Sequence, residues 1–159
     1  MSHWDLLLRW QQQGKSLSPL LGAPCIRSSC FKIDWLHTAD LGMTADVLGS
    51  IFKMLLPKMQ GNSDLLRFNQ LFLLMQTCYR AKQVESRLDH LTPLMLCKHK
   101  QTPKLRAKAA EARGLVPFAR DTAVLLLSDA VPAESAAKQA AICLAACYDC
   151  LSHANFCCR

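Results

Sequence analysis

Only one short segment of this 159-residue chain alternates apolar and polar side chains as a β-strand does. It runs Cys30-Phe31-Lys32-Ile33-Asp34-Trp35, and no second segment of this kind is evident to pair with it. A lone strand is unstable because its backbone donors and acceptors need partners. The sequence therefore predicts a mainly α-helical fold: an irregular bundle of about five to six helices with one short orphan strand near residues 31–35.

Helical spacing of apolar residues begins at Thr44, which we expect to cap a helix that stops at Pro57. Ser63 is expected to cap a long second helix that has Asp64 in its first turn. The apolar positions expected to form the face of that helix are Leu65, Leu66, Phe68, Leu71, Phe72, Met75, Cys78 and Tyr79.

Two Thr-Pro steps, at residues 92–93 and 102–103, each predict a helix start, because proline suits the first helical position. The first helix is expected to reach about Lys98, and the second is expected to run from Lys104 to Arg113. Gly114 and Pro117 then predict an interruption before a helix over 118–127, and Pro132 opens a last helix that ends near His153.

The domain organisation expected is a short helix and loop over residues 1–30, followed by a single helical domain over 31–159. Half of the chain is apolar (51%) and a fifth is charged (19%), which is typical of globular proteins. No apolar run has the length of a membrane span, and Asp5 and Arg9 interrupt the N-terminal apolar stretch. We therefore expect an intracellular protein, nuclear or cytoplasmic, that is neither secreted nor bound to a membrane.

The nine cysteines are an odd number and lie mostly in helix-like runs, so reduced thiols are expected rather than a disulfide framework. Six potential zinc ligands gather near the C-terminus: Cys143, Cys147, Cys150, His153, Cys157 and Cys158. Their spacing is typical of one helix face rather than of the turns that present thiolates tetrahedrally. The sequence therefore predicts no cofactor.

The net charge of +7 comes from one quarter of the chain. Between Arg80 and Arg120 there are ten basic and three acidic residues, a surplus of seven, whereas the remainder holds nine of each. Candidate nucleic-acid-binding residues in this segment are Lys98, Lys100, Lys104, Arg106 and Lys108. The alternative is that they form the solvated face of packed helices, which the lack of interleaved aromatic residues favours.

The most specific stretch is F-K-I-D-W-L-H-T-A-D-L-G-M-T-A-D-V-L-G, residues 31–49. A carboxylate at a strand end, Asp34, followed three residues later by His37, is a sensible arrangement for an active site, and a hard oxygen ligand there suits Mg²⁺. In two-metal phosphoryl transfer several carboxylates hold the ions, so Asp34 alone does nothing. Alternatively, Asp34 caps the following turn and His37 bonds locally.

This stretch resembles a segment of the DDE-type transposases with a ribonuclease-H-like fold, especially the CACTA and Plavaka kinds with a large helical insertion. The resemblance implies that Asp34 corresponds to the second metal-binding carboxylate and that His37 supports it. The helices from Thr44 to His153 would then correspond to the insertion. The first catalytic aspartate and the final glutamate of that family have no counterparts here, so Mg²⁺ would bind at Asp34 only if residues from outside the chain completed the site.

The sequence thus leads to a transposon-derived, catalytically inactive fragment with weak, non-specific affinity for DNA through the basic segment. The alternative is a helical protein–protein interaction module that binds a partner through apolar helix faces and has no role with nucleic acid. A metal-dependent enzyme with an unrecognised site ranks last.

Overall fold

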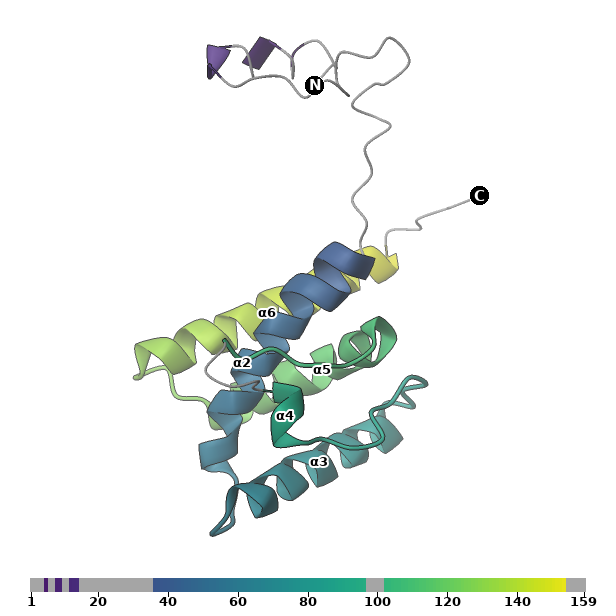
Figure 1. The fold of residues 1–159 in the computed structure, drawn as a ribbon, viewed down its shortest axis with the longest axis vertical. Helices are drawn as coiled ribbons and strands as arrows, with labels where there is room; N and C mark the ends of the chain where they lie inside the picture. Colours follow the sequence, from purple (N-terminus) through teal and green to yellow (C-terminus); the bar gives the residue numbers. More distant parts are fainter. Residues whose placement is uncertain (1–4, 6–7, 10–11, 15–35, 97–101, 154–159) are drawn as a thin grey trace. The chain divides into compact units, whose positions relative to one another are not determined.

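The computed structural model describes residues 36–96 and 102–153, and, nearer the N-terminus, residues 5, 8, 9 and 12–14 (Figure 1). The chain divides into two compact units, Met1–Asp34 and Trp35–Arg159. In the first unit, residues 5, 8, 9 and 12 are helical, and the backbone N–H of Gln13 donates to the carbonyl of Arg9 at 3.1 Å. The orphan strand expected near residues 31–35 lies outside the described residues.

The second unit is helical. Over 36–96 and 102–153 the chain forms five α-helices and no β-strand, which confirms the mainly α fold class. The elements are the π-helix η3 (Leu36–Thr44), α2 (Ala45–Leu55), the 3-10 turn η4 (Leu56–Lys58), α3 (Asp64–Ala81), α4 (Pro93–Leu96), α5 (Ala109–Leu126) and α6 (Pro132–His153). None of the helices in the described part is both long and apolar enough to cross a membrane.

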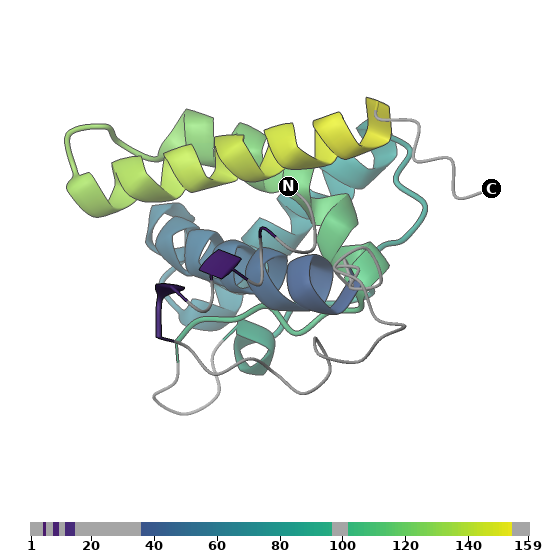
Figure 2. The same ribbon diagram turned by 90° about the horizontal axis from the view of Figure 1, so that it is seen from above.

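Helix α2 lies at the centre of this unit and contacts α4, α5 and α6 (Figures 1 and 2). Its Leu48, Ile51, Phe52 and Leu55 recur at three- and four-residue spacing and are all buried. The ring of Phe52 packs against that of Phe118 in α5, with 6.0 Å between centroids and an interplanar angle of 54°. Burial of this apolar face, which the periodicity predicts, is the main source of stability for a helix of only 11 residues.

The extended segment 102–108 crosses α2 at Gly49. A Cβ atom at Gly49 would lie 2.6 Å from the Cα atom of Lys104, closer than van der Waals contact allows. The backbone N–H of Leu105 donates to the carbonyl of Ala45 at 2.8 Å, and that of Arg106 donates to Met95 at 2.8 Å. Only a glycine lets the two backbones approach this closely.

These hydrogen bonds correct one predicted helix start. The helix expected from Lys104 to Arg113 is wrong over its first half, because α5 begins only at Ala109. The Thr102-Pro103 signal is overridden: the segment satisfies its backbone donors across α2 and α4 instead of within a helical turn. The first Thr-Pro step is confirmed, since α4 begins at Pro93.

The interruption expected at Gly114 and Pro117 is also wrong, because α5 continues through both residues. Gly114 serves close packing, since a Cβ there would lie 2.9 Å from Cγ1 of Val84. Pro117 leaves the Arg113 carbonyl without its usual partner four residues on, a cost that burial of Val116 and Phe118 on either side offsets.

Two predicted caps have different outcomes. Ser63 caps α3 as expected: its hydroxyl accepts from the N–H of Leu66 at 3.3 Å. Thr44 does not cap α2, because η3 runs directly into that helix and Thr44 itself has helical backbone angles (φ −62°, ψ −43°).

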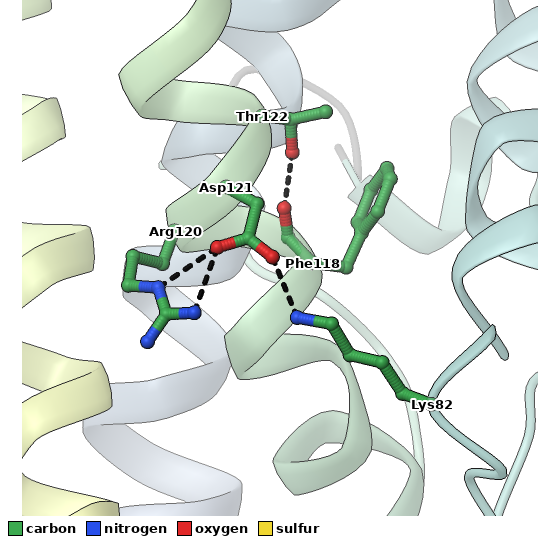
Figure 3. A network of polar contacts seen from close by, with 5 residues as sticks. All are labelled: Lys82, Phe118, Arg120, Asp121 and Thr122. Carbon is green, nitrogen blue, oxygen red and sulfur yellow. Dashed lines mark hydrogen bonds and ion pairs between the residues drawn. The ribbon is translucent and has the colours of Figure 1, made fainter.

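The C-terminal end of α3 is joined to α5 by an ion pair (Figure 3). The Lys82 ammonium lies 2.5 Å from Oδ2 of Asp121, whose Oδ1 also accepts from Nε of Arg120 at 2.9 Å. Burial raises the pKa of Asp121, but hydrogen bonds from the two cations outweigh it and leave that pKa below its ordinary value. In the next residue, the Thr122 hydroxyl donates to the carbonyl of Phe118 (Figure 3).

Replacing Gly49 with alanine tests the close approach at segment 102–108. Alanine favours a helix by about 1 kcal/mol over glycine, yet we expect Gly49→Ala to destabilise the protein, because its methyl group collides with backbone atoms. Urea unfolding followed by circular dichroism measures the difference. The control is Lys53→Ala at an exposed position of the same helix, expected to change stability by less than about 0.5 kcal/mol. A stabilised Gly49→Ala would contradict the packing described.

Candidate functional site

The predicted catalytic pair falls at the edge of the described residues. Asp34 lies outside them, and His37 is exposed in the first turn of η3. Within the described part of the chain, no three His, Cys, Asp or Glu side chains converge as ligands for a metal ion. The assignment of Asp34 and His37 as a fragment of a catalytic site therefore stays a prediction.

The carboxylate that the structure places at the centre of a network is Asp40, which is fully buried. Its Oδ2 accepts a hydrogen bond from Nη2 of Arg113 in α5, and its Oδ1 accepts one from the hydroxyl of Tyr148 in α6. Tyr148 also bonds to Thr44 Oγ1 at 2.8 Å. We call Asp40, Thr44, Arg113 and Tyr148 the Asp40 clamp. It joins η3 to two helices that lie 73 and 108 positions further along the chain.

The protonation of Tyr148 follows from this geometry. Burial and the hydrogen bond to Asp40 raise the pKa of Tyr148 to about 12, so the phenol is protonated at neutral pH. Because its one proton goes to Asp40, the Thr44 hydroxyl donates to the phenol oxygen. The hydrogen bond to Asp40 raises the pKa of Arg113, and the guanidinium lies 5.9 Å from the centroid of the Tyr148 ring, within cation–π range.

The Asp40 clamp holds the fold together, and its carboxylate is not free for chemistry. Both carboxylate oxygens accept from protein donors and the side chain has no solvent exposure, so Asp40 offers no free position to a metal ion or substrate. Sequence reasoning missed this network. Its members are too far apart in the chain for spacing to join them, and the Ala- and Cys-rich segment around Tyr148 reads as plain helix.

The predicted basic residues are partly brought together. Lys98 and Lys100 lie outside the described residues, whereas Lys104, Arg106 and Lys108 all occupy exposed, alternate positions of the extended segment. Exposure alternates along this segment, because Leu105 is buried and Ala107 is half-buried between the three basic residues. Lys104 lies 3.4 Å from Asp46 and Lys108 lies 3.5 Å from Glu111, so acids neutralise part of this row.

Helix α3 presents an apolar outer face. Phe68, Leu71, Met75 and Tyr79 are buried as predicted, but Leu65 and Leu66, expected on the same face, are 64% and 53% exposed. Leu73 and Leu74, one helical repeat further on, are also exposed, at 61% and 39%. We call Leu65, Leu66, Leu73 and Leu74 the leucine face. Simple spacing misassigned its first two residues because α3 is apolar on more than one side.

An open pocket of about 250 Å³ adjoins the C-terminal end of α3. It is lined by Gln76, Tyr79, Arg80, Arg87, Leu88 and Asp89. Tyr79 anchors its wall, because the Tyr79 hydroxyl accepts from the N–H of Leu88 at 3.3 Å. Two arginines against one aspartate make this pocket suited to a carboxylate.

Comparison with known proteins adds no relative: no protein-family model, no curated protein and no solved structure matches this chain. The transposase resemblance therefore stays a prediction from the sequence.

The Asp40 clamp gives a prediction for Tyr148→Phe. Removing the hydroxyl leaves a buried carboxylate with one donor fewer, which costs about 1–3 kcal/mol. The raised pKa of Tyr148 means that folding favours the protonated phenol. The contribution of the Tyr148 hydroxyl to stability is therefore complete below pH 10, the ordinary pKa of tyrosine, and is lost as the pH rises towards 12. The stability difference between the two proteins should shrink over that range.

Urea unfolding in reducing buffer at several pH values measures this difference. Ser152→Ala is the control, because Ser152 is exposed on the same helix and its hydroxyl only donates back to the Tyr148 carbonyl at 2.9 Å. A Tyr148→Phe protein that is as stable as wild type at pH 7 would show that the clamp contributes nothing.

Proposed function

We propose that this chain is a helical protein-interaction module that binds an amphipathic helix of a partner protein through the leucine face of α3. The observation that carries this proposal is the exposure of four leucines on one 18-residue helix. Single exposed apolar residues are common on protein surfaces, but a cluster of large ones marks an interaction site.

The spacing of the leucine face suits a helical partner. Leu66 and Leu73 lie seven residues apart, which is about 10.5 Å along a helix. A helix that packs against another presents apolar side chains at this repeat. The exposed residues Asn69 and Thr77, on the same side as Leu66 and Leu73, are uncharged, and Arg80 follows on this side seven residues after Leu73.

Charge indicates the character of that partner. The leucine face ends beside the pocket that holds Arg80 and Arg87. A partner helix with an acidic residue at the matching end could place its carboxylate in this pocket, where arginine recognises it well. A second copy packed parallel to the first would instead bring arginines towards arginines. We therefore assign the face to an acidic amphipathic helix from another protein.

A second candidate function is weak, non-specific binding to nucleic acid. It is supported by the row of Lys104, Arg106 and Lys108 on one side of the extended segment. Both ion pairs are long and their lysines are exposed, and such pairs are worth little, so phosphates could displace Asp46 and Glu111. Under the transposase resemblance, the chain would be an inactive insertion that keeps this affinity.

The leucine face can be tested by peptide selection. A displayed library of amphipathic helices is selected against the full chain, and the recovered peptides are measured by fluorescence anisotropy. We expect acidic helical binders whose affinity falls at least tenfold for Leu66→Lys/Leu73→Lys. The control is Val124→Lys/Leu125→Lys, which adds the same charge at exposed apolar positions near the end of α5. Recovery of no binder, or equal losses in both variants, would refute the proposal.

The nucleic-acid candidate is tested by titrating duplex DNA at 50 mM and 200 mM salt. Three phosphate contacts predict that log K falls with log salt with a slope of roughly −2.7. Replacing Lys104, Arg106 and Lys108 together with glutamine should remove most of the binding and of the slope. The single variant Lys53→Gln, at an exposed lysine of α2, should leave both nearly unchanged. Absence of binding at 50 mM salt would rule this function out.

A further inference from the structure

The outer face of α6 differs from that of an ordinary surface helix. Its exposed side is formed by residues at three- and four-residue spacing: Ala136, Gln139, Cys143, Ala146, Cys147 and Cys150. We call these six residues the thiol face. Surface helices normally turn charged and polar side chains towards solvent, and cysteine is among the residue types most often buried. Three free thiols exposed together therefore indicate a surface that is covered in the functional state.

The charges of α6 are directed elsewhere. Glu134 lies 2.8 Å from Lys58, and Lys138 lies 2.9 Å from Asp129, with only 17% and 12% of the α6 side chains exposed. Asp149 lies beside the thiol face but is not part of it. Ile142, which is 36% exposed, lies beside it on the same side. The thiol face itself is uncharged.

We propose that the thiol face is a self-association surface, on which two copies of this chain pair through α6 and are then linked by disulfides between them. Charge permits a second copy at this place. The chain has a net charge of +7, so two copies repel each other over most orientations, but an uncharged stripe can meet its own copy without repulsion. The small side chains of alanine and cysteine also allow the two helices to approach closely.

The spacing of the thiols fits a symmetric pair. In a parallel pair, each cysteine faces its own copy. In an antiparallel pair centred between Ala146 and Cys147, Cys143 of one copy faces Cys150 of the other, twice, and the two Cys147 thiols lie near the axis. Either orientation therefore brings thiols of the two copies together.

The size of the helix explains why thiols are needed. The 22 residues of α6 span about 33 Å, and a contact about 10 Å wide along this length covers roughly 330 Å² per copy. A stable complex usually buries about 800 Å² per partner. Apolar contact alone thus gives a weak, reversible dimer, and a covalent link makes it persistent.

The chemistry is thiol–disulfide exchange with a small-molecule disulfide such as oxidised glutathione. A thiolate of one copy attacks that disulfide, forms a mixed disulfide and expels one small thiolate. A thiolate of the second copy attacks the mixed disulfide, forms the bond between copies and expels the second small thiolate. Two protein thiols are oxidised, one small disulfide is reduced to two thiols, and the released thiolates take up the two protons.

The test uses the full chain with reductant or with oxidised glutathione, analysed by light scattering after gel filtration and by non-reducing electrophoresis. Wild type should be mainly monomeric when reduced and should form a covalent dimer when oxidised. The variant Cys143→Ser/Cys147→Ser/Cys150→Ser should form at least tenfold less covalent dimer than wild type. Its matched control replaces Cys25, Cys30, Cys97, Cys157 and Cys158 with serine and should dimerise as wild type does.

A second variant separates pairing from thiol chemistry. Ala146→Glu keeps all the cysteines but places like charges opposite each other, so covalent dimer formation should slow at least tenfold while circular dichroism stays unchanged. Peptide mapping should find bonds between copies involving Cys143, Cys147 or Cys150. The proposal would be overturned if the oxidised protein stayed monomeric or if the disulfides formed only within one copy. It would also be overturned if the variant without the α6 thiols formed as much covalent dimer as wild type. Because no α3 residue is changed, binding to the leucine face is tested separately.

Discussion

The arrangement of helices in the second unit depends on one buried carboxylate, that of Asp40. A fully buried Asp40 is costly unless donors replace its hydration, and the chain supplies a guanidinium from α5 and a phenol from α6 for this purpose. These donors fix where η3 lies against both helices, and α2 continues directly from η3. The apolar core supplies most of the stabilisation, but it is tolerant of small rotations. The directional bonds to Asp40 are what select one arrangement.

The same network bears on the D-x-x-H stretch that gave the sequence its most specific resemblance. Two aspartates of that stretch lie inside the described residues: Asp40 is committed to holding helices together, whereas Asp46 is exposed and lies 3.4 Å from Lys104. His37 lies at the surface. Three other surfaces described above are exposed: the leucine face, the thiol face and a short basic row. They lie on α3, α6 and the extended segment respectively.

Much of the fold could be predicted from local signals. Periodicity identified α2, α3 and α6, and Ser63, Pro93 and Pro132 mark helix starts where the structure has them. The errors occurred where tertiary contacts override local preference, as at Gly114 and Pro117. Glycine there serves close packing rather than a turn, and buried neighbours hold the helix across a proline. The Asp40 clamp could not be predicted, because nothing in the sequence joins residues that lie so far apart.

The nine-residue π-helix η3 has a consequence for how this chain could change. Each hydrogen-bonded ring of a π-helix holds one more residue than a ring of an α-helix, and such helices are rare and usually limited to a single turn. If η3 rewound into the α form, the residues before α2 would rotate about the axis, and Asp40 would turn away from its donors. Tertiary bonds therefore maintain an intrinsically unfavourable winding. Deleting one residue between Leu36 and Asp40 would leave the clamp itself in register and alter only the entry to the helix. A deletion between Asp40 and Thr44 would instead separate the two positions that Tyr148 holds together.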